Sequence, residues 1–452
     1  MQRTKETLPY QQISDISLHL DSLVSLDKQY WAFKGRSRRN HCHAFISYPA
    51  MMVPEMQGEL IDILKRQDPS INSIFDPFVG SGTTLGEALI RGFDFFGTDI
   101  NPLAILSCEV KASPLFIDAL KIKINDLKHS IQSDNSTEVD ISFFGLNKWF
   151  IPRVQIGLCK LRRAIKQERQ PWARRFFWLV LCDTVRKTCN SRSSTYKLHI
   201  KQEEIIENVS NPIEVFLKKL DKNLSFRVEQ KQIHEKNGSL KSGRFISKVD
   251  LKLQDVNQPV ASNVKQYDLM ITSPPYGDNS TTVPYGQYSY LPLQWIDTED
   301  LRAIVPKNLL KNSSSIDSAG LGGSRKDALK KAEYLLSLSP SFKETYNNIS
   351  TKTKDGLKRL SSFIADLDSS LPNILSYLKG GGYMAWTLGN RNIGGVEVPL
   401  NKILRELLEA KECEFIYEIN RDILGKRMPA RNNASKTMTK ETVLVMRKCQ
   451  NE

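Results

Sequence analysis

The sequence predicts an α/β protein with a doubly wound, mostly parallel sheet and an inserted helical region. Two observations support this fold class. Residues 73–99 read as strand, glycine turn, helix, strand and acidic residue, which is the first half of a doubly wound domain. Strand-like segments then return at 245–253 and 267–272, after a long stretch of polar, helix-type sequence. The sheet is therefore expected to be assembled from two separated parts of the chain.

The first part begins with a helix at 54–64, where apolar residues recur at helical spacing. A short apolar strand is expected at 73–78, and the glycine-rich turn 79–84 follows it. A helix at 85–90 and a second strand at 93–98 complete the unit, which ends at Asp99. This order places the glycine turn and Asp99 at the same edge of the sheet, because parallel strands end on the same side.

The later part of the chain is expected to hold the rest of the sheet. Residues 380–387 read as a buried strand after a glycine turn, and residues 441–446 read as the final strand. A Ser-, Gly- and Lys-rich segment at about 308–331 is typical of a mobile loop. We therefore divide the chain into an N-terminal segment with the first half of the sheet domain, an inserted helical region, and the second half of the sheet domain, at 1–112, 113–243 and 244–452.

Composition excludes several classes of protein. The 452 residues suggest about two or three domains. The chain shows no apolar run long enough to span a bilayer and no signal-peptide core, so we expect a cytoplasmic protein without a membrane partner. Its seven cysteines are widely spread and form no CxxC pair, which argues against a disulfide framework and a zinc ribbon. The net charge of +14, from 64 Lys+Arg and 50 Asp+Glu, favours a polyanionic partner.

The glycine turn is the first candidate site. Gly80 and Gly82 permit a tight turn and close approach of a ligand to the backbone, and the next helix offers unpaired N–H groups. The next glycine is Gly86, so the spacing departs from GxGxxG and does not favour a dinucleotide. Asp99 could accept hydrogen bonds from ribose hydroxyls. Alternatively, the glycines form only a turn and Asp99 only caps the helix that begins near Pro102.

The second candidate site is the sequence Ser-Pro-Pro-Tyr at 273–276, which follows the expected strand 267–272. Two consecutive prolines hold the backbone extended, so that nearby carbonyl groups point at whatever occupies the adjoining space. Tyr276 can stack on a planar group. This set suits the binding of an aromatic amine through its N–H hydrogens. The alternative is a strand end marked by prolines, with a tyrosine that belongs to the core.

Together these motifs resemble the S-adenosylmethionine-dependent DNA amino-methyltransferases of restriction–modification systems. DPFVGSGTT (76–84) resembles their cofactor loop, GTDINPLA (97–104) their ribose-binding strand end, and SPPY (273–276) their catalytic motif. Serine before the prolines is typical of the enzymes that methylate the N4 amine of cytosine, whereas Asp or Asn is usual in N6-adenine enzymes. The resemblance implies a Rossmann-like methyltransferase fold with a seven-stranded sheet, and S-adenosyl-L-methionine as cofactor.

The resemblance also assigns roles to single residues. Segment 48–50 resembles the part that closes over the methionine end of the cofactor, and Asp255 stands where an acidic residue near the adenine is expected. Segments 382–391 and 426–429 resemble later elements of some N4 enzymes. The implied catalytic residues are Ser273, Pro274, Pro275 and Tyr276. The implied cofactor-binding residues are Tyr48, Pro49, Asp76, Phe78, Gly80, Gly82, Thr83, Thr84, Asp99 and Asp255.

The order of the motifs departs from most N4 enzymes, because the cofactor loop precedes SPPY. The large region between them is a candidate for target recognition. Within it, loop 190–197 places Arg192 and Lys197 where they could contact DNA. The basic stretch 162–175 could contact phosphates or could form a solvated helix face. Lys426 and Arg427 could line a DNA cleft or flank a turn.

The resemblance implies direct methyl transfer to a base that leaves a DNA duplex. Double-stranded DNA is then the partner, and a cognate restriction endonuclease is a functional partner. An N6-adenine enzyme, an RNA base-amine methyltransferase and a non-catalytic DNA-binding specificity module remain alternatives. The absence of a Pro-Cys pair excludes the nucleophile motif of C5-cytosine enzymes. No metal is expected, because His41-Cys42-His43 lacks a second pair of ligands.

Overall fold

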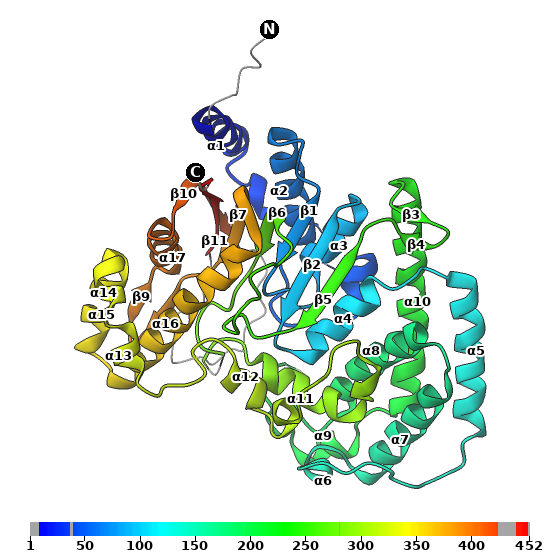
Figure 1. The fold of residues 1–452 in the computed structure, drawn as a ribbon. Coiled ribbons are helices and arrows are strands. Elements are labelled where there is room, and N and C mark those ends of the chain that lie inside the picture. The colour runs from blue at the N-terminus through cyan, green and yellow to red at the C-terminus, as the bar shows by residue number, and fades with distance from the viewer. Residues whose placement is uncertain (1–8, 37–38, 193, 280, 424–439, 451–452) are drawn as a thin grey trace.

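The computed structural model describes residues 9–36, 39–192, 194–279, 281–423 and 440–450. Within these ranges seven strands form one sheet in the order β10-β11-β7-β6-β1-β2-β5 (Figure 1). Their bounds are Ser73–Asp76 (β1), Asp94–Asp99 (β2), Val249–Leu253 (β5), Tyr267–Thr272 (β6), Leu378–Leu388 (β7), Cys413–Asp422 (β10) and Lys440–Lys448 (β11). The five strands from β5 to β7 are parallel, whereas β11 pairs antiparallel with both β7 and the edge strand β10. This confirms the predicted fold class.

The sheet reverses its direction of growth between β1 and β6. The chain runs from β1 outward to β2 and β5, then returns to place β6 on the other side of β1. The connections that leave the ends of β1 and β6 therefore move apart, and a crevice opens between them. In open α/β sheets, ligands bind in the crevice at such a switch point. The glycine turn and the SPPY motif follow these two strands.

Helices cover both faces of the sheet, as Figure 1 shows. Ile74 of β1 packs on the face covered by α1, α2 and α3, and the next residue, Phe75, packs on the face covered by α15, α16 and α17. This alternation follows from the two-residue period of a strand. The helices are Pro9–Leu26 (α1), Pro54–Gln67 (α2), Thr83–Ile90 (α3), Pro340–Ser350 (α15), Lys354–Ser376 (α16) and Leu400–Glu409 (α17).

The region between the two halves is helical, as predicted, and forms a lobe beside the sheet (Figure 1). Its helices are Ile117–Ser133 (α5), Leu146–Trp149 (α6), Pro152–Gln167 (α7), Pro171–Thr188 (α8), Glu203–Glu207 (α9) and Pro212–Lys236 (α10). All of these except α9, which has no buried residue, share one apolar core with Pro102–Lys111 (α4) and Tyr285–Trp295 (α11). Trp178 and Phe177 of α8 are fully buried there. The inserted region is thus tied to elements that border the crevice.

Two expectations about local structure were wrong. The single strand expected at 245–253 is divided into β4 (Arg244–Phe245), which forms a small hairpin with β3 (Leu240–Lys241), and β5. Segment 308–331, expected to be a mobile loop, contains η4 (Lys307–Leu310), α12 (Ser315–Ala319) and the start of α13 (Ala328–Ala332). Leu309, Ile316 and Leu321 are buried in this segment. Scattered apolar residues thus anchor a stretch whose composition is typical of a loop.

The remaining elements are short connections. They are η1 (Tyr30–Ala32), η2 (His41–Ala44), η3 (Thr298–Asp300), α14 (Leu335–Leu338), β8 (Arg391–Ile393) and β9 (Val396–Val398).

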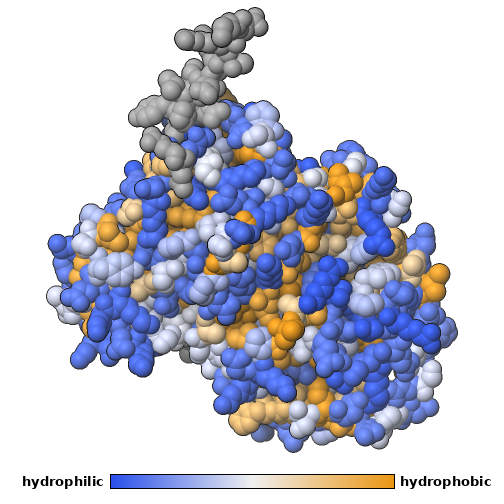
Figure 2. All heavy atoms as spheres, in the orientation of Figure 1, coloured by the Kyte–Doolittle hydropathy of each residue, from blue (hydrophilic) through white to orange (hydrophobic). Residues whose placement is uncertain are grey.

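No helix among the described residues is long and apolar enough to cross a membrane. The face drawn in Figure 2 is mostly hydrophilic, with apolar side chains gathered near its centre.

Candidate active site

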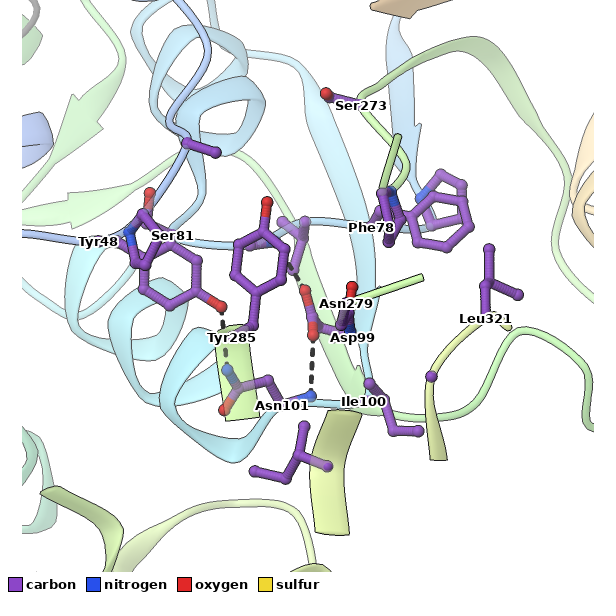
Figure 3. A pocket seen from close by; sticks show the side chains of 18 of the residues that line it. Tyr48, Phe78, Ser81, Asp99, Ile100, Asn101, Ser273, Asn279, Tyr285 and Leu321 are labelled. Atoms are coloured by element: carbon purple, nitrogen blue, oxygen red, sulfur yellow. Dashed lines mark hydrogen bonds between the residues drawn. The ribbon is translucent and has the colours of Figure 1, made fainter. Parts of the chain in front are cut away.

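A cavity with about 870 Å³ of empty space lies where β1, β2 and β6 end. This space includes the opening to solvent, and most of the surface that lines it is apolar, as is typical of sites for cofactors and small molecules. Its walls come from parts of the chain that are far apart in sequence: segments 48–52, 77–81, 99–101 and 254–256, with Thr83, Ser273, Pro275, Asn279, Tyr285, Ile316, Gly320 and Leu321. The cavity therefore brings the glycine turn, Asp99, Asp255 and part of the SPPY motif together, as Figure 3 shows for several of these residues.

The glycine turn is held by Asp99. Gly80 and Gly82 both have left-handed backbone conformations, with φ of 51° and 81°. The Gly80 N–H and the Asn101 N–H donate to different oxygens of the Asp99 carboxylate, each at 2.8 Å. Burial raises the pKa of Asp99 to about 6, although these N–H groups act in the opposite direction. A carboxylate fixed in this way lines the cavity and can accept further hydrogen bonds from a ligand.

Three of the predicted cofactor-binding residues do not line the cavity. Asp76 is fully buried behind the turn, where one carboxylate oxygen accepts hydrogen bonds from Thr272 Oγ1 at 2.7 Å and from the Phe78 N–H at 3.1 Å. Thr84 Oγ1 donates to the Ile271 carbonyl at 3.3 Å. A side chain at Gly82 would lie 2.8 Å from Cys108 Sγ. In this structure these residues shape the turn and join β1 to β6.

Two tyrosines form a wall that only partly follows from the sequence. Tyr48, a predicted cofactor residue, stacks on Tyr285 of α11 with ring centroids 5.9 Å apart (Figure 3). Asn101 Nδ2 donates to the Tyr48 hydroxyl at 3.0 Å and to Ser289 Oγ at 2.8 Å. Sequence reasoning missed Tyr285. No local pattern marks this residue, because its place at the cavity depends on the packing of α11 against segment 48–52.

The SPPY motif turns sharply after β6. Ser273 and Pro275 line the cavity, whereas Pro274 is buried. Tyr276 is half-buried, and its hydroxyl accepts a hydrogen bond from Ser273 Oγ at 3.3 Å. Burial raises the pKa of Tyr276 well above its usual range. The motif thus presents a hydroxyl group at the cavity, with the aromatic ring of Tyr276 behind it.

An ion pair holds the loop that follows the motif. Asp278 and Arg391 are both largely buried, and Arg391 Nη1 lies 3.2 Å from Asp278 Oδ2. The guanidinium group passes so close to Gly277 that a Cβ there would lie 1.8 Å from Arg391 Nη1. Asn279, next in the chain, lines the cavity. The conformation of the loop therefore depends on a glycine and on an arginine more than 100 residues away.

The short helix α12 closes the cavity on another side. Ile316, Gly320 and Leu321 line it. The Asp317 carboxylate accepts hydrogen bonds from the N–H groups of Gly286 and Gln287, at 2.8 and 3.1 Å, and so joins α12 to the first turn of α11. This wall lies in the segment that composition marked as a loop, which explains why sequence reasoning did not place it at the site.

The loop that carries Arg192 and Lys197 packs against α11. Ser191 and Ile200 form an antiparallel bridge, and the Leu198 N–H donates to Gln287 Oε1 at 3.2 Å. The side chain of Arg192 is exposed and that of Lys197 is half-buried. Two cations therefore lie on a loop fixed to the helix that carries Tyr285. Lys426 and Arg427 lie outside the described residues.

The basic stretch 162–175 is largely neutralised inside the protein. Arg163 pairs with Asp134 at 2.8 Å, Arg175 pairs with Glu109 at 3.0 Å, and Arg174 pairs with Asp300. Lys166 lies 3.3 Å from Asp297. These contacts join α7 and α8 to their neighbours, which favours a structural role over phosphate contact for this stretch.

The residues His41, Cys42 and His43 are buried beside α3, and their potential ligand atoms lie within 4.8 Å of one another. His43 Nε2 is 3.1 Å from Glu87 Oε1. Burial and the positive charge of Lys111 lower the pKa of His43 well below its usual range. The positive charge of Lys111 also disfavours a bound cation at this place. That no metal binds here stays a prediction.

Comparison with known proteins gives two relatives, and no family model matches the chain. The chain is 30% identical over 448 residues to the type II methyltransferase M.MvaI of Kocuria varians, a match that covers 95% of this chain and 96% of that protein. It is also 34% identical over 92 residues to the type II methyltransferase M.MjaII of Methanocaldococcus jannaschii, covering 20% of this chain and 17% of that protein.

Proposed function

The chain belongs to the type II methyltransferases, the DNA methyltransferases of restriction–modification systems, and we propose that it methylates the N4 amine of a cytosine in duplex DNA. The observation that carries this proposal is the single cavity lined by the glycine turn, Asp99 and Ser273. A cofactor site and an amine-binding motif that face the same space suit a direct transfer between two bound molecules.

The cavity fits S-adenosyl-L-methionine. Its apolar walls suit the adenine ring, and the Asp99 carboxylate is fixed where ribose hydroxyls could donate to it. Asp255, Tyr48 and Pro49 also line the cavity; Asp255 would hold the adenine end of the cofactor, and Tyr48 and Pro49 would cover the methionine end. The bound cofactor supplies an electrophilic methyl group on its sulfonium.

The residues of the SPPY motif orient the target amine. Ser273 Oγ and the carbonyl of Pro274 accept the amine hydrogens, so that the nitrogen lone pair points at the methyl group. The ring of Tyr276 stacks on the base. The base must leave the duplex, because its amine is otherwise paired and out of reach. Positioning then supplies most of the catalysis.

DNA is held on the side of the inserted region. Arg192 and Lys197 lie on the loop that packs on α11, and α11 carries Tyr285 of the cavity. Cations at this place can contact phosphates close to an extracted base. A cognate restriction endonuclease would recognise the same DNA site.

The test is methyl transfer from tritiated S-adenosylmethionine, compared between duplex DNA and tRNA. We expect label in DNA, and we expect Tyr276→Ala to abolish most of it while S-adenosylmethionine still binds in calorimetry. Label in tRNA alone would replace DNA with RNA as the substrate. Failure to bind S-adenosylmethionine would leave a non-catalytic specificity module as the better account.

A further inference from the structure

A chain of two hydrogen bonds leads from the SPPY serine to a carboxylate on the last strand. Ser273 Oγ donates to the Tyr276 hydroxyl at 3.3 Å, and that hydroxyl donates to Glu441 Oε1 at 3.2 Å. Glu441 is the second residue of β11. Its other carboxylate oxygen lies 3.4 Å from Arg421 Nη1, directly opposite on β10. The carboxylate is thus held from both sides.

The two ends of this chain have different surroundings. Ser273 lines the cavity, whereas the side chain of Glu441 is 21% exposed to solvent. Tyr276 lies between them and is half-buried. Both hydrogens point away from the cavity, from serine to tyrosine and from tyrosine to glutamate. This is the arrangement that a proton needs to move from the cavity to the surface.

The proposed reaction produces a proton that must leave. When the S–CH₃ bond breaks and the N–CH₃ bond forms, the positive charge moves from sulfur to the amine nitrogen. In the proposed arrangement the carboxylates that line the cavity serve the cofactor, because Asp99 would face its ribose and Asp255 its adenine.

We infer that Ser273, Tyr276 and Glu441 form a proton relay that takes a proton from the target amine as the methyl group is transferred, with Glu441 as the terminal acceptor. This inference rests on the proposed function. The amine gives its proton to Ser273 Oγ, the serine proton passes to the tyrosine oxygen, and the tyrosine proton passes to Glu441. The carboxylate becomes a neutral acid, both hydroxyl groups are regenerated, and the exposed acid then releases the proton to water.

The experiment measures single-turnover methyl transfer from tritiated S-adenosylmethionine to duplex DNA. Glu441→Gln keeps the acceptor oxygen but cannot take a proton, and Tyr276→Phe keeps the stacking ring but removes the hydroxyl. Glu414→Gln, an exposed carboxylate on β10, is the matched control. We expect each relay variant to be about 100-fold slower, the lower end of what positioned proton transfer contributes. Affinities for the cofactor and for DNA should match the wild type.

Two further readouts separate a relay from a merely structural role. The double variant should be no slower than the slower single variant, because both changes interrupt the same path. The solvent deuterium isotope effect on the methyl-transfer rate of the wild type should be absent in the relay variants. Single-variant rates within about threefold of wild type, or effects that multiply, would overturn the relay. A wild-type enzyme that methylates no cytosine would instead overturn the proposed function, so the two failures are distinguishable.

Discussion

Replacing Asp76 by Asn should stabilise the protein at neutral and alkaline pH. Asp76 is fully buried at the end of β1, and burial raises the pKa of its carboxyl from 3.8 to about 7. The two hydrogen bonds to one carboxylate oxygen, from Thr272 and Phe78, act in the opposite direction but do not compensate. Asn keeps an acceptor oxygen for both donors and carries no charge.

The magnitude follows from the shift. A difference of about three pKa units corresponds to about 4 kcal/mol of unfolding free energy. Between pH 4 and pH 7, Asp76 keeps its proton in the folded state but has lost it in the unfolded state, so the stability of the wild type falls as pH rises. The full loss of unfolding free energy is present above about pH 7. Asp76→Asn should show no such loss of stability. The unfolding free energies of the variant and the wild type should therefore become equal near pH 4.

Urea unfolding followed by tryptophan fluorescence, at a series of pH values, measures this difference. Asp118→Asn is the control, because the side chain of Asp118 is 89% exposed. A variant whose advantage over wild type stays constant from pH 4 to pH 8 would refute the reasoning, as would a variant that is less stable at pH 8.

Three further predictions concern the cavity and DNA. Because the pKa of Asp99 is about 6, affinity for S-adenosylmethionine in calorimetry should fall as pH drops below 6, and Asp99→Asn should bind weakly at every pH. Gly277→Ala should lose most of its methyl-transfer rate and about 1–3 kcal/mol of stability, because the new methyl group would displace Arg391. Replacing Arg192 and Lys197 by Ala should weaken DNA binding in fluorescence anisotropy and lower its dependence on salt, with cofactor affinity unchanged.

Controls sharpen these three predictions. Gly395→Ala introduces the same methyl group where nothing lies within 4 Å, although the left-handed φ of 78° there adds backbone strain. It should therefore lose some stability while its methyl-transfer rate stays near wild type. If Gly277→Ala behaves like Gly395→Ala, the close approach of Arg391 does not determine the loop. Cofactor binding by Asp99→Asn that equals wild type would remove the proposed ribose contact. An unchanged salt slope in the Arg192 and Lys197 variant would place DNA elsewhere.

The sequence was most informative about the central strands. Strand β6 spans the six residues expected, because a short apolar run followed by two consecutive prolines has few alternatives. β1 and β2 were also predicted, because the glycine turn marks the end of β1 and Asp99 marks the end of β2. Strand β10 was missed. It is an edge strand whose charged and apolar residues only partly alternate, and its pairing with β11 across 424–439 is a long-range contact.

The sequence likewise identified only some of the residues of the candidate site. Local motifs identified Gly80, Asp99 and Ser273, which the structure brings to one cavity. Tyr285 and the α12 wall were not identified, because their place depends on how distant segments pack rather than on a local pattern. Glu441 was expected only as part of a strand. Its contact with Tyr276 joins residues 165 positions apart, and such a pair has no sequence signature.

The measurement that tests the central claim most directly is nucleoside analysis of duplex DNA methylated by the purified protein with labelled S-adenosylmethionine. Digestion to nucleosides followed by mass spectrometry separates N4-methylcytosine, C5-methylcytosine and N6-methyladenine. Our account predicts N4-methylcytosine, and predicts its loss in Tyr276→Ala. Label in N6-methyladenine alone would contradict the base assignment, and label in C5-methylcytosine would contradict direct transfer to an amine.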